Sequence, residues 1–152
     1  LKEAREALPE ADKWAVEKLR YIDEGAQVAQ AISEGTAIAV SDGSYKDRFG
    51  TSAFNLKGPQ PSDDILGLNV IPGSPDDQQA YRSELGGISG IVTTVGLLCQ
   101  THSITSGAIE GGLDGERAMK VVSQDWEPSP TDPDFDLIYD IRAKIKKLPV
   151  AF

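Results

Sequence analysis

Residues 36–44 read Thr-Ala-Ile-Ala-Val-Ser-Asp-Gly-Ser, an apolar run that ends in four polar, turn-forming residues. A short apolar run bounded by turn signals is typical of a buried strand, which we expect over residues 36–40, with a turn at 41–44. Two further strand candidates follow at residues 49–56 and 65–71, separated by a stretch rich in Gly and Pro. Three consecutive strands therefore open the predicted domain.

A long helix is predicted over residues 78–100, because apolar side chains recur there at steps of three and four. Four glycines in this segment each lower intrinsic helicity by about 1 kcal/mol relative to alanine, so we expect close packing of the helix on a sheet. Residues 107–113 predict a fourth strand and residues 115–122 a short helix. An Asp-Pro pair then predicts the start of a helix over 134–147.

The order of these elements predicts an α/β domain built in layers. Before them, residues 10–21 and 23–33 have the pattern of short amphipathic helices, so residues 1–35 are interpreted as an N-terminal helical extension of a domain over 36–152. Residues 148–152 look like the beginning of a strand. We therefore expect a fragment whose domain is incomplete at its C-terminal end, with a truncated fifth strand.

The composition limits the classes of protein to which the chain can belong. The chain has 152 residues, 39% hydrophobic and 26% charged, which fits one soluble domain. No apolar run approaches the roughly 18 residues of a membrane span, and no export signal opens the chain, so we expect an intracellular protein without a membrane partner. Cys99, the single cysteine, follows two leucines and is interpreted as a buried apolar residue.

The net charge of −9 argues against a nucleic-acid partner, because affinity for phosphates comes chiefly from Lys and Arg. Acidic residues are nevertheless what a magnesium site requires. Hydrolysis of a phosphodiester through two metal ions needs carboxylates that converge from separate elements. Asp42 after the first strand, Glu84 in the first turns of the long helix and Asp114 after the fourth strand fit this pattern. Taken singly, the aspartates could instead shape turns, and Glu84 could be a surface acid.

Other polar groups have simpler interpretations. The alternating acids at 132–136 lack the glycine and glutamate of a calcium loop, and the helix dipole explains them. His102 is interpreted as a structural loop residue. The basic group Arg142, Lys144, Lys146 and Lys147 is interpreted as a solvated helix face, with contact to a phosphate backbone as the alternative.

Three segments together resemble ribonuclease H domains, particularly those of retroelement reverse transcriptases. The matching segments are residues 39–47 with 50–54 (AVSDGSYKD and GTSAF), 79–88 (QAYRSELGGI) and 113–119 (LDGERAM). The order Asp, Glu, Asp is informative, because integrases and transposases of the same fold place their glutamate last. The resemblance covers roughly residues 36–152.

The resemblance implies a ribonuclease H-like mixed sheet of about five strands with helices on both faces. It also implies a metal-dependent endonuclease that cuts the RNA strand of RNA–DNA hybrids with two Mg²⁺ or Mn²⁺ ions. It implies that Asp42, Glu84 and Asp114 are the metal ligands and catalytic residues, that Ser44, Arg82 and Ser83 contact the nucleic acid, and that the chain belongs to a larger polyprotein. A fourth acidic ligand of the family is missing, so the fragment alone is expected to be weak or inactive. The alternative is a catalytically incomplete structural or docking module.

Overall fold

A five-stranded mixed sheet organises the computed structural model, which describes residues 1–111 and 134–152. Its strand order is β1-β4-β3-β2-β5, and all neighbours are antiparallel except β2 and β5, which are parallel. The strands are β1 (Lys18–Arg20), β2 (Ala37–Lys46), β3 (Phe49–Lys57), β4 (Ile65–Val70) and β5 (Ile109–Gly111). This sheet confirms the predicted α/β fold class.

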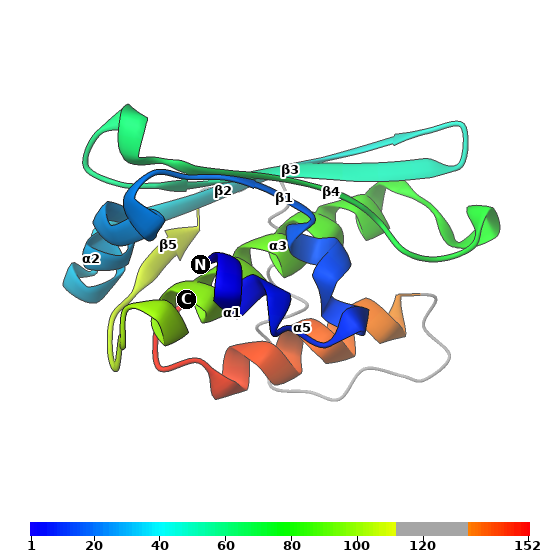
Figure 1. Ribbon diagram of the computed structural model, residues 1–152. Helices are drawn as coiled ribbons and strands as arrows, with labels where there is room; N and C mark the ends of the chain where they lie inside the picture. The colour runs from blue at the N-terminus through cyan, green and yellow to red at the C-terminus, as the bar shows by residue number, and fades with distance from the viewer. Residues whose placement is uncertain (112–133) are drawn as a thin grey trace.

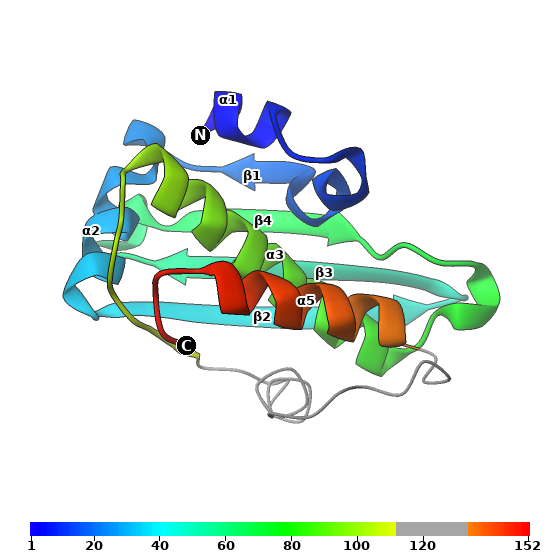
Figure 2. The ribbon, with the colours of Figure 1, turned by 90° about the horizontal axis from the view of Figure 1, so that it is seen from below.

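The helices lie on one side of this sheet in the part of the chain that the structure describes. Figure 1 shows α1, α3 and α5 beneath the sheet and α2 at one end, and Figure 2 shows α3 running across it from below. The expectation of helices on both faces is therefore not met by the described residues. The α-helices are α1 (Lys2–Glu6), α2 (Ala26–Glu34), α3 (Ala80–Thr101) and α5 (Phe135–Lys147), and the 3₁₀ helices are η1 (Glu10–Val16), η2 (Asp23–Gly25), η3 (Pro61–Asp63) and η4 (Pro75–Asp77).

None of the helices in the described ranges is long and apolar enough to cross a membrane. The buried apolar residues form two clusters, and α3 contributes to both of them. The larger cluster joins Val16, Val28 and Ile32 to Leu56 of β3 and Leu98 of α3. The first 35 residues thus share the core of the sheet.

Two local predictions were wrong. The helix expected over residues 10–21 is the 3₁₀ helix η1 followed by strand β1, which pairs with β4. The turn expected at residues 41–44 is absent, because pairing with β3 continues to Lys46 opposite Phe49. The hairpin turns instead at Asp47 and Arg48, whose φ angles of 52° and 63° are those of a two-residue turn matched to the strand twist. Cross-strand pairing has overridden the Asp-Gly turn signal.

The expected close packing of α3 on the sheet is confirmed at its glycines. A Cβ atom at Gly90 would lie 2.3 Å from the ring of Phe54, and one at Gly67 of β4 would lie 2.1 Å from the same ring. The fully buried Phe54 ring therefore fills the space that these two glycines leave. Glycine at these positions lets the backbone of α3 lie almost directly on the strands.

We predict opposite effects for alanine at two glycines of α3. Gly90→Ala should lower the free energy of unfolding by about 1–3 kcal/mol, because the new methyl group overlaps Phe54 and the ring must move. Gly96→Ala is the matched control, since its Cβ would make an ordinary 3.6 Å contact with Leu148. It should raise stability by roughly 0.5–1 kcal/mol through helix propensity. Urea denaturation measures both, and equal effects would contradict the packing described.

Candidate functional site

Asp42 lies in the middle of β2 and is exposed. Its neighbour Gly43 faces α3, because a Cβ at Gly43 would lie 2.7 Å from the backbone nitrogen of Glu84. Successive side chains of a strand point to opposite faces of the sheet, so Asp42 points away from α3. It borders a shallow hollow with Ser44, Thr51 and Ala53.

Glu84 is half-buried in the first turns of α3, between the buried residues Ser83 and Leu85. The contact with Gly43 sets Glu84 level with Asp42 along β2. The structure thus brings the backbones of Gly43 and Glu84 together, while the Asp42 side chain points away from α3.

The two carboxylates could meet at the edge of β2 beside Asp42. Strand β5 pairs with β2 only at Ala37–Ala39, so the described residues leave this edge unpaired at Asp42. Asp114, the third predicted ligand, lies outside the described residues. Within the described ranges, no group of three potential metal-binding side chains is assembled. A shared ion would require the Glu84 side chain to extend around the edge of β2.

Arg82, predicted to contact nucleic acid, instead holds an internal ion-pair network at the start of α3. Its Nε and Nη2 donate to the carbonyl of Pro72 at 3.0 and 2.8 Å, and Nη1 and Nη2 donate to the carboxylate of Asp136 at 2.9 and 2.8 Å. Nη1 also reaches Asp134 at 3.3 Å. Since Arg82 is 2% exposed, it cannot reach a substrate without breaking this network.

The same network ties two helices together. Gln79 donates to Asp134 at 2.9 Å, so the beginnings of α3 and α5 are joined by hydrogen bonds from both Gln79 and Arg82. The hydrogen bonds from Arg82 hold the pKa of Asp136 below its ordinary value, and Asp136 in turn raises the pKa of Arg82. The sequence did not reveal this role, because the helix dipole alone was enough to explain the acids Asp134 and Asp136 at the start of α5.

The structure also shows where the other polar residues singled out in the sequence lie. Ser83 is fully buried and its hydroxyl donates to Gln79, which contradicts a contact with nucleic acid, whereas Ser44 is exposed on the same face as Asp42. Arg142 is 7% exposed, and Lys144 pairs with Asp12 and Asp140 at 3.1 and 2.9 Å. The basic group of α5 is therefore partly internal.

The structure agrees with the interpretation of His102 as a structural residue and of Cys99 as a buried apolar residue. The ring nitrogen Nε2 of His102 lies 2.6 Å from the carbonyl of Glu24, a structural contact between two loops. Cys99 is buried, and burial raises the pKa of its thiol, so it is an unreactive core residue.

Comparisons with known proteins complete this description. No protein-family model matches the chain, and no curated protein matches it in sequence. Two solved structures are similar to it: the N-terminal RNase H domain of a Mycobacterium tuberculosis protein, at 12% identity over 76% of this chain and 77% of that chain, and RNase H1 of the archaeon Halobacterium salinarum, at 14% identity over 76% and 80%. Both give a TM-score of 0.47.

The fold assignment rests on the topology of the chain itself. Three antiparallel strands, β2 to β4, are followed by the helix α3, which crosses the sheet and leads to the parallel strand β5 beside β2. This arrangement is a ribonuclease H-like fold.

We predict that Asp136→Asn destabilises the protein at pH 7 by about 1–2 kcal/mol, because the charged hydrogen bonds with Arg82 are lost. A carboxylate whose folded-state pKa is lowered stabilises above its unfolded pKa of about 3.9, and loses that contribution as the pH falls through the folded value. The difference between parent and variant should therefore be constant at neutral pH and shrink below about pH 4.

The matched control is Asp140→Asn, which removes one of two carboxylate partners of Lys144 and should cost less than about 1 kcal/mol, because Asp12 still pairs with Lys144. Thermal unfolding of the three proteins between pH 2 and 7 makes the comparison. A difference between parent and Asp136→Asn that grows on acidification would contradict the assigned ion pair.

Proposed function

We propose that this chain is a metal-dependent endonuclease of ribonuclease H type, which hydrolyses the RNA strand of RNA–DNA hybrids as part of a reverse transcriptase polyprotein. One observation supports the site most: the approach of α3 to Gly43 sets Glu84 level with Asp42 beside an edge of β2 that is unpaired in the described residues. The matching segments around Asp42, Glu84 and Asp114 support the family and the substrate.

The donor set fits a hard divalent cation. Asp42, Glu84 and Asp114 supply only carboxylate oxygens, which are the ligands that Mg²⁺ and Mn²⁺ prefer. Two such ions, when bound, would activate water and stabilise the leaving oxygen. Asp42 would bind both ions, Glu84 one ion, and Asp114 the ion on the side of the nucleophile.

The residues of the chain would position the substrate and the ligands. Pairing of Asp42 with Ala53 of β3 holds its backbone in a rigid strand, which keeps the carboxylate in a defined direction. Glu84 would also lie near the 2′-hydroxyl of the RNA, the group that distinguishes RNA from DNA. The hydroxyl of Ser44 lies two residues further along the same face and would hydrogen-bond a phosphate oxygen.

A second candidate function is a catalytically incomplete module that serves as a structural or docking domain. A specific observation favours it: the Asp42 side chain points away from α3, the helix that carries Glu84. The burial of Arg82 and Ser83 also leaves the site with fewer groups that could bind a nucleic acid.

A magnesium titration separates the two functions. The parent protein should be stabilised against thermal unfolding, by about 2.7 kcal/mol when the ion is at a hundred times its dissociation constant. Asp42→Asn and Glu84→Gln should lose this stabilisation and cleavage of an RNA–DNA hybrid, while folding as the parent does without metal. Asp47→Asn, in the β2–β3 turn, is the control and should behave as the parent.

The contrary results are equally specific. Equal magnesium stabilisation and cleavage in Asp42→Asn and the parent would reject Asp42 as a ligand. A parent that neither binds magnesium nor cuts the hybrid would favour the docking module.

A further inference from the structure

Two polar side chains, Asn69 of β4 and Ser52 of β3, are buried between the sheet and α3, at 4% and 3% exposed. The hydroxyl of Ser52 donates to Oδ1 of Asn69. The amide nitrogen Nδ2 of Asn69 donates to the carbonyl of Ala15 at 3.0 Å and to the carbonyl of Gly86 at 3.1 Å. Asn69 therefore connects three elements, β3, η1 and α3, through one buried amide.

These two residues continue the row of the sheet in which β2 touches α3. Gly43 pairs with Ser52, and Ser52 pairs with Asn69, so the three form one row across β2, β3 and β4. The helix meets both ends of this row. A Cβ at Gly43 would lie 2.7 Å from the backbone nitrogen of Glu84, and Asn69 binds the carbonyl of Gly86, two residues later in the same turn. The turn of α3 that carries Glu84 is thus attached to the sheet at two points.

The bond from Asn69 restrains α3 in a way that apolar packing does not. The helix contributes to both apolar clusters, and apolar attraction has no preferred direction. A hydrogen bond weakens steeply when its length or angle changes, and a slide of α3 by one residue would move the carbonyl of Gly86 by about 1.5 Å. Arg82 ties α3 to α5 and to the loop at Pro72, not to a strand. Asn69 therefore adds a directional restraint between α3 and the strands.

We propose that Asn69 is a positioning residue for the candidate metal site. Through the carbonyl of Gly86 it fixes the position of α3 along its axis, and through Ser52 it holds the strands beside Asp42. It thereby sets how far the Glu84 side chain must reach to an ion at Asp42. The effect on the metal rests on the proposed function, whereas the restraint on α3 does not. Groups that orient metal ligands typically contribute about 10–100-fold in metal affinity.

The energetics of buried polar pairs favour positioning over stability as the role of Asn69. A buried hydrogen bond adds little net stability, because both groups give up water when the chain folds. Replacing both partners by apolar groups of similar shape is often nearly neutral. Leucine at position 69 and alanine at position 52 would therefore preserve much of the stability. What the polar pair adds beyond such an apolar pair is a defined direction of contact with α3.

Isothermal titration calorimetry with magnesium tests the effect on the metal site. The double variant Asn69→Leu with Ser52→Ala should raise the magnesium dissociation constant at least about tenfold. Thr94→Val is the matched control, because Thr94 is fully buried on α3 and its hydroxyl has no hydrogen-bond partner among the described residues. It should leave the dissociation constant unchanged. So should Val28→Ala, which lowers stability through the apolar core at α2.

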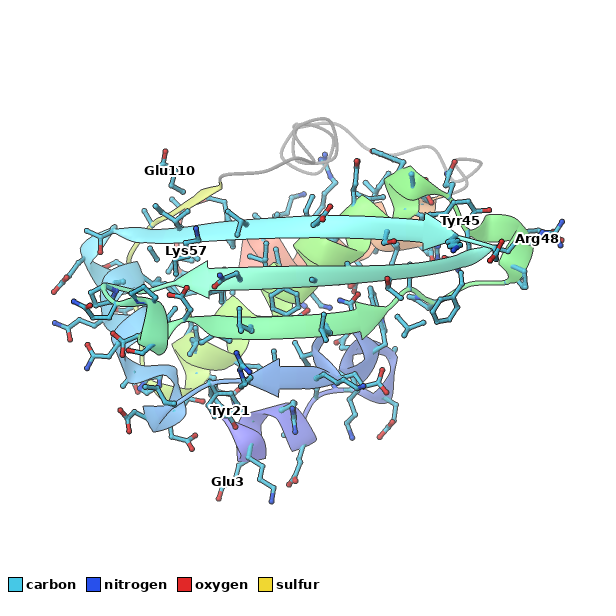
Figure 3. The ribbon with its side chains drawn as sticks, turned by 90° about the horizontal axis from the view of Figure 1, so that it is seen from above. Glu3, Tyr21, Tyr45, Arg48, Lys57 and Glu110 are labelled. Carbon is cyan, nitrogen blue, oxygen red and sulfur yellow. The ribbon has the colours of Figure 1, made fainter. Side chains whose placement is uncertain are left out.

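A distance between two spin labels tests the restraint on α3 without metal. Lys57→Cys labels the end of β3 that Figure 3 shows opposite Arg48, Ala80→Cys labels the first residue of α3, and Cys99→Ala removes the native thiol. Figure 2 shows α3 crossing the sheet, so a slide along its axis changes this distance. Double electron–electron resonance should give one narrow distance distribution for the parent and for Thr94→Val, and a broadened or shifted one for the double variant.

Ser52→Ala alone guards against a double variant that fails to fold. It removes one hydroxyl and should raise the magnesium dissociation constant about threefold or more. An unchanged dissociation constant or an unchanged distance distribution in the folded variants would overturn the proposal, and so would an equal loss of affinity in Val28→Ala. A parent that binds no magnesium would contradict the proposed function instead, and the spin-label distances would then still decide whether Asn69 restrains α3.

Discussion

The near-contact of the α3 backbone with the sheet is the constraint on which the rest of the structure depends. At Gly43 the backbone of β2 lies directly against the backbone of α3, and at Gly90 of α3 the ring of Phe54 fills the space that the glycine leaves. This approach places the first turns of α3, with Glu84, level with Asp42. It also makes the helix face of the sheet a tightly packed layer, in which the polar side chains of β2 and β3 include the small residues Ser41 and Ser52.

The ion-pair network around Arg82 fixes the same end of α3 from the other side. Its guanidinium holds the carbonyl of Pro72 and the carboxylate of Asp136, and thereby joins the loop before α3 to the beginning of α5. Removing one member would leave a buried charge without its partner, which is costly in a medium of low polarity. Glycine packing and this network together leave α3 little freedom to shift. Any movement needed to bring Glu84 to Asp42 must therefore come from the Glu84 side chain.

Much of the fold follows from local sequence patterns, and the failures have physical causes. The helix α3 and the strands β2, β3 and β4 were predicted because the hydrophobic pattern of each segment matches the face that it buries in the folded chain. The strand β1 was missed because two of its three residues are charged, and its partner β4 is distant in sequence. The turn at Asp42 was predicted wrongly because a local signal cannot reveal pairing with β3 up to Lys46. For the site, the sequence patterns select Asp42 and Glu84, but the opposite faces of Asp42 and Gly43 and the burial of Arg82 appear only in three dimensions.

The most direct test of this account is the position of a bound metal ion. Crystals of the protein soaked in Mn²⁺ and measured by anomalous diffraction would show whether one ion is ligated by both Asp42 and Glu84. The account predicts an anomalous peak at the edge of β2 beside Asp42, with the Glu84 side chain extended around that edge to reach it. Manganese that binds elsewhere, or that binds Asp42 while Glu84 remains on the far side of β2, would contradict it.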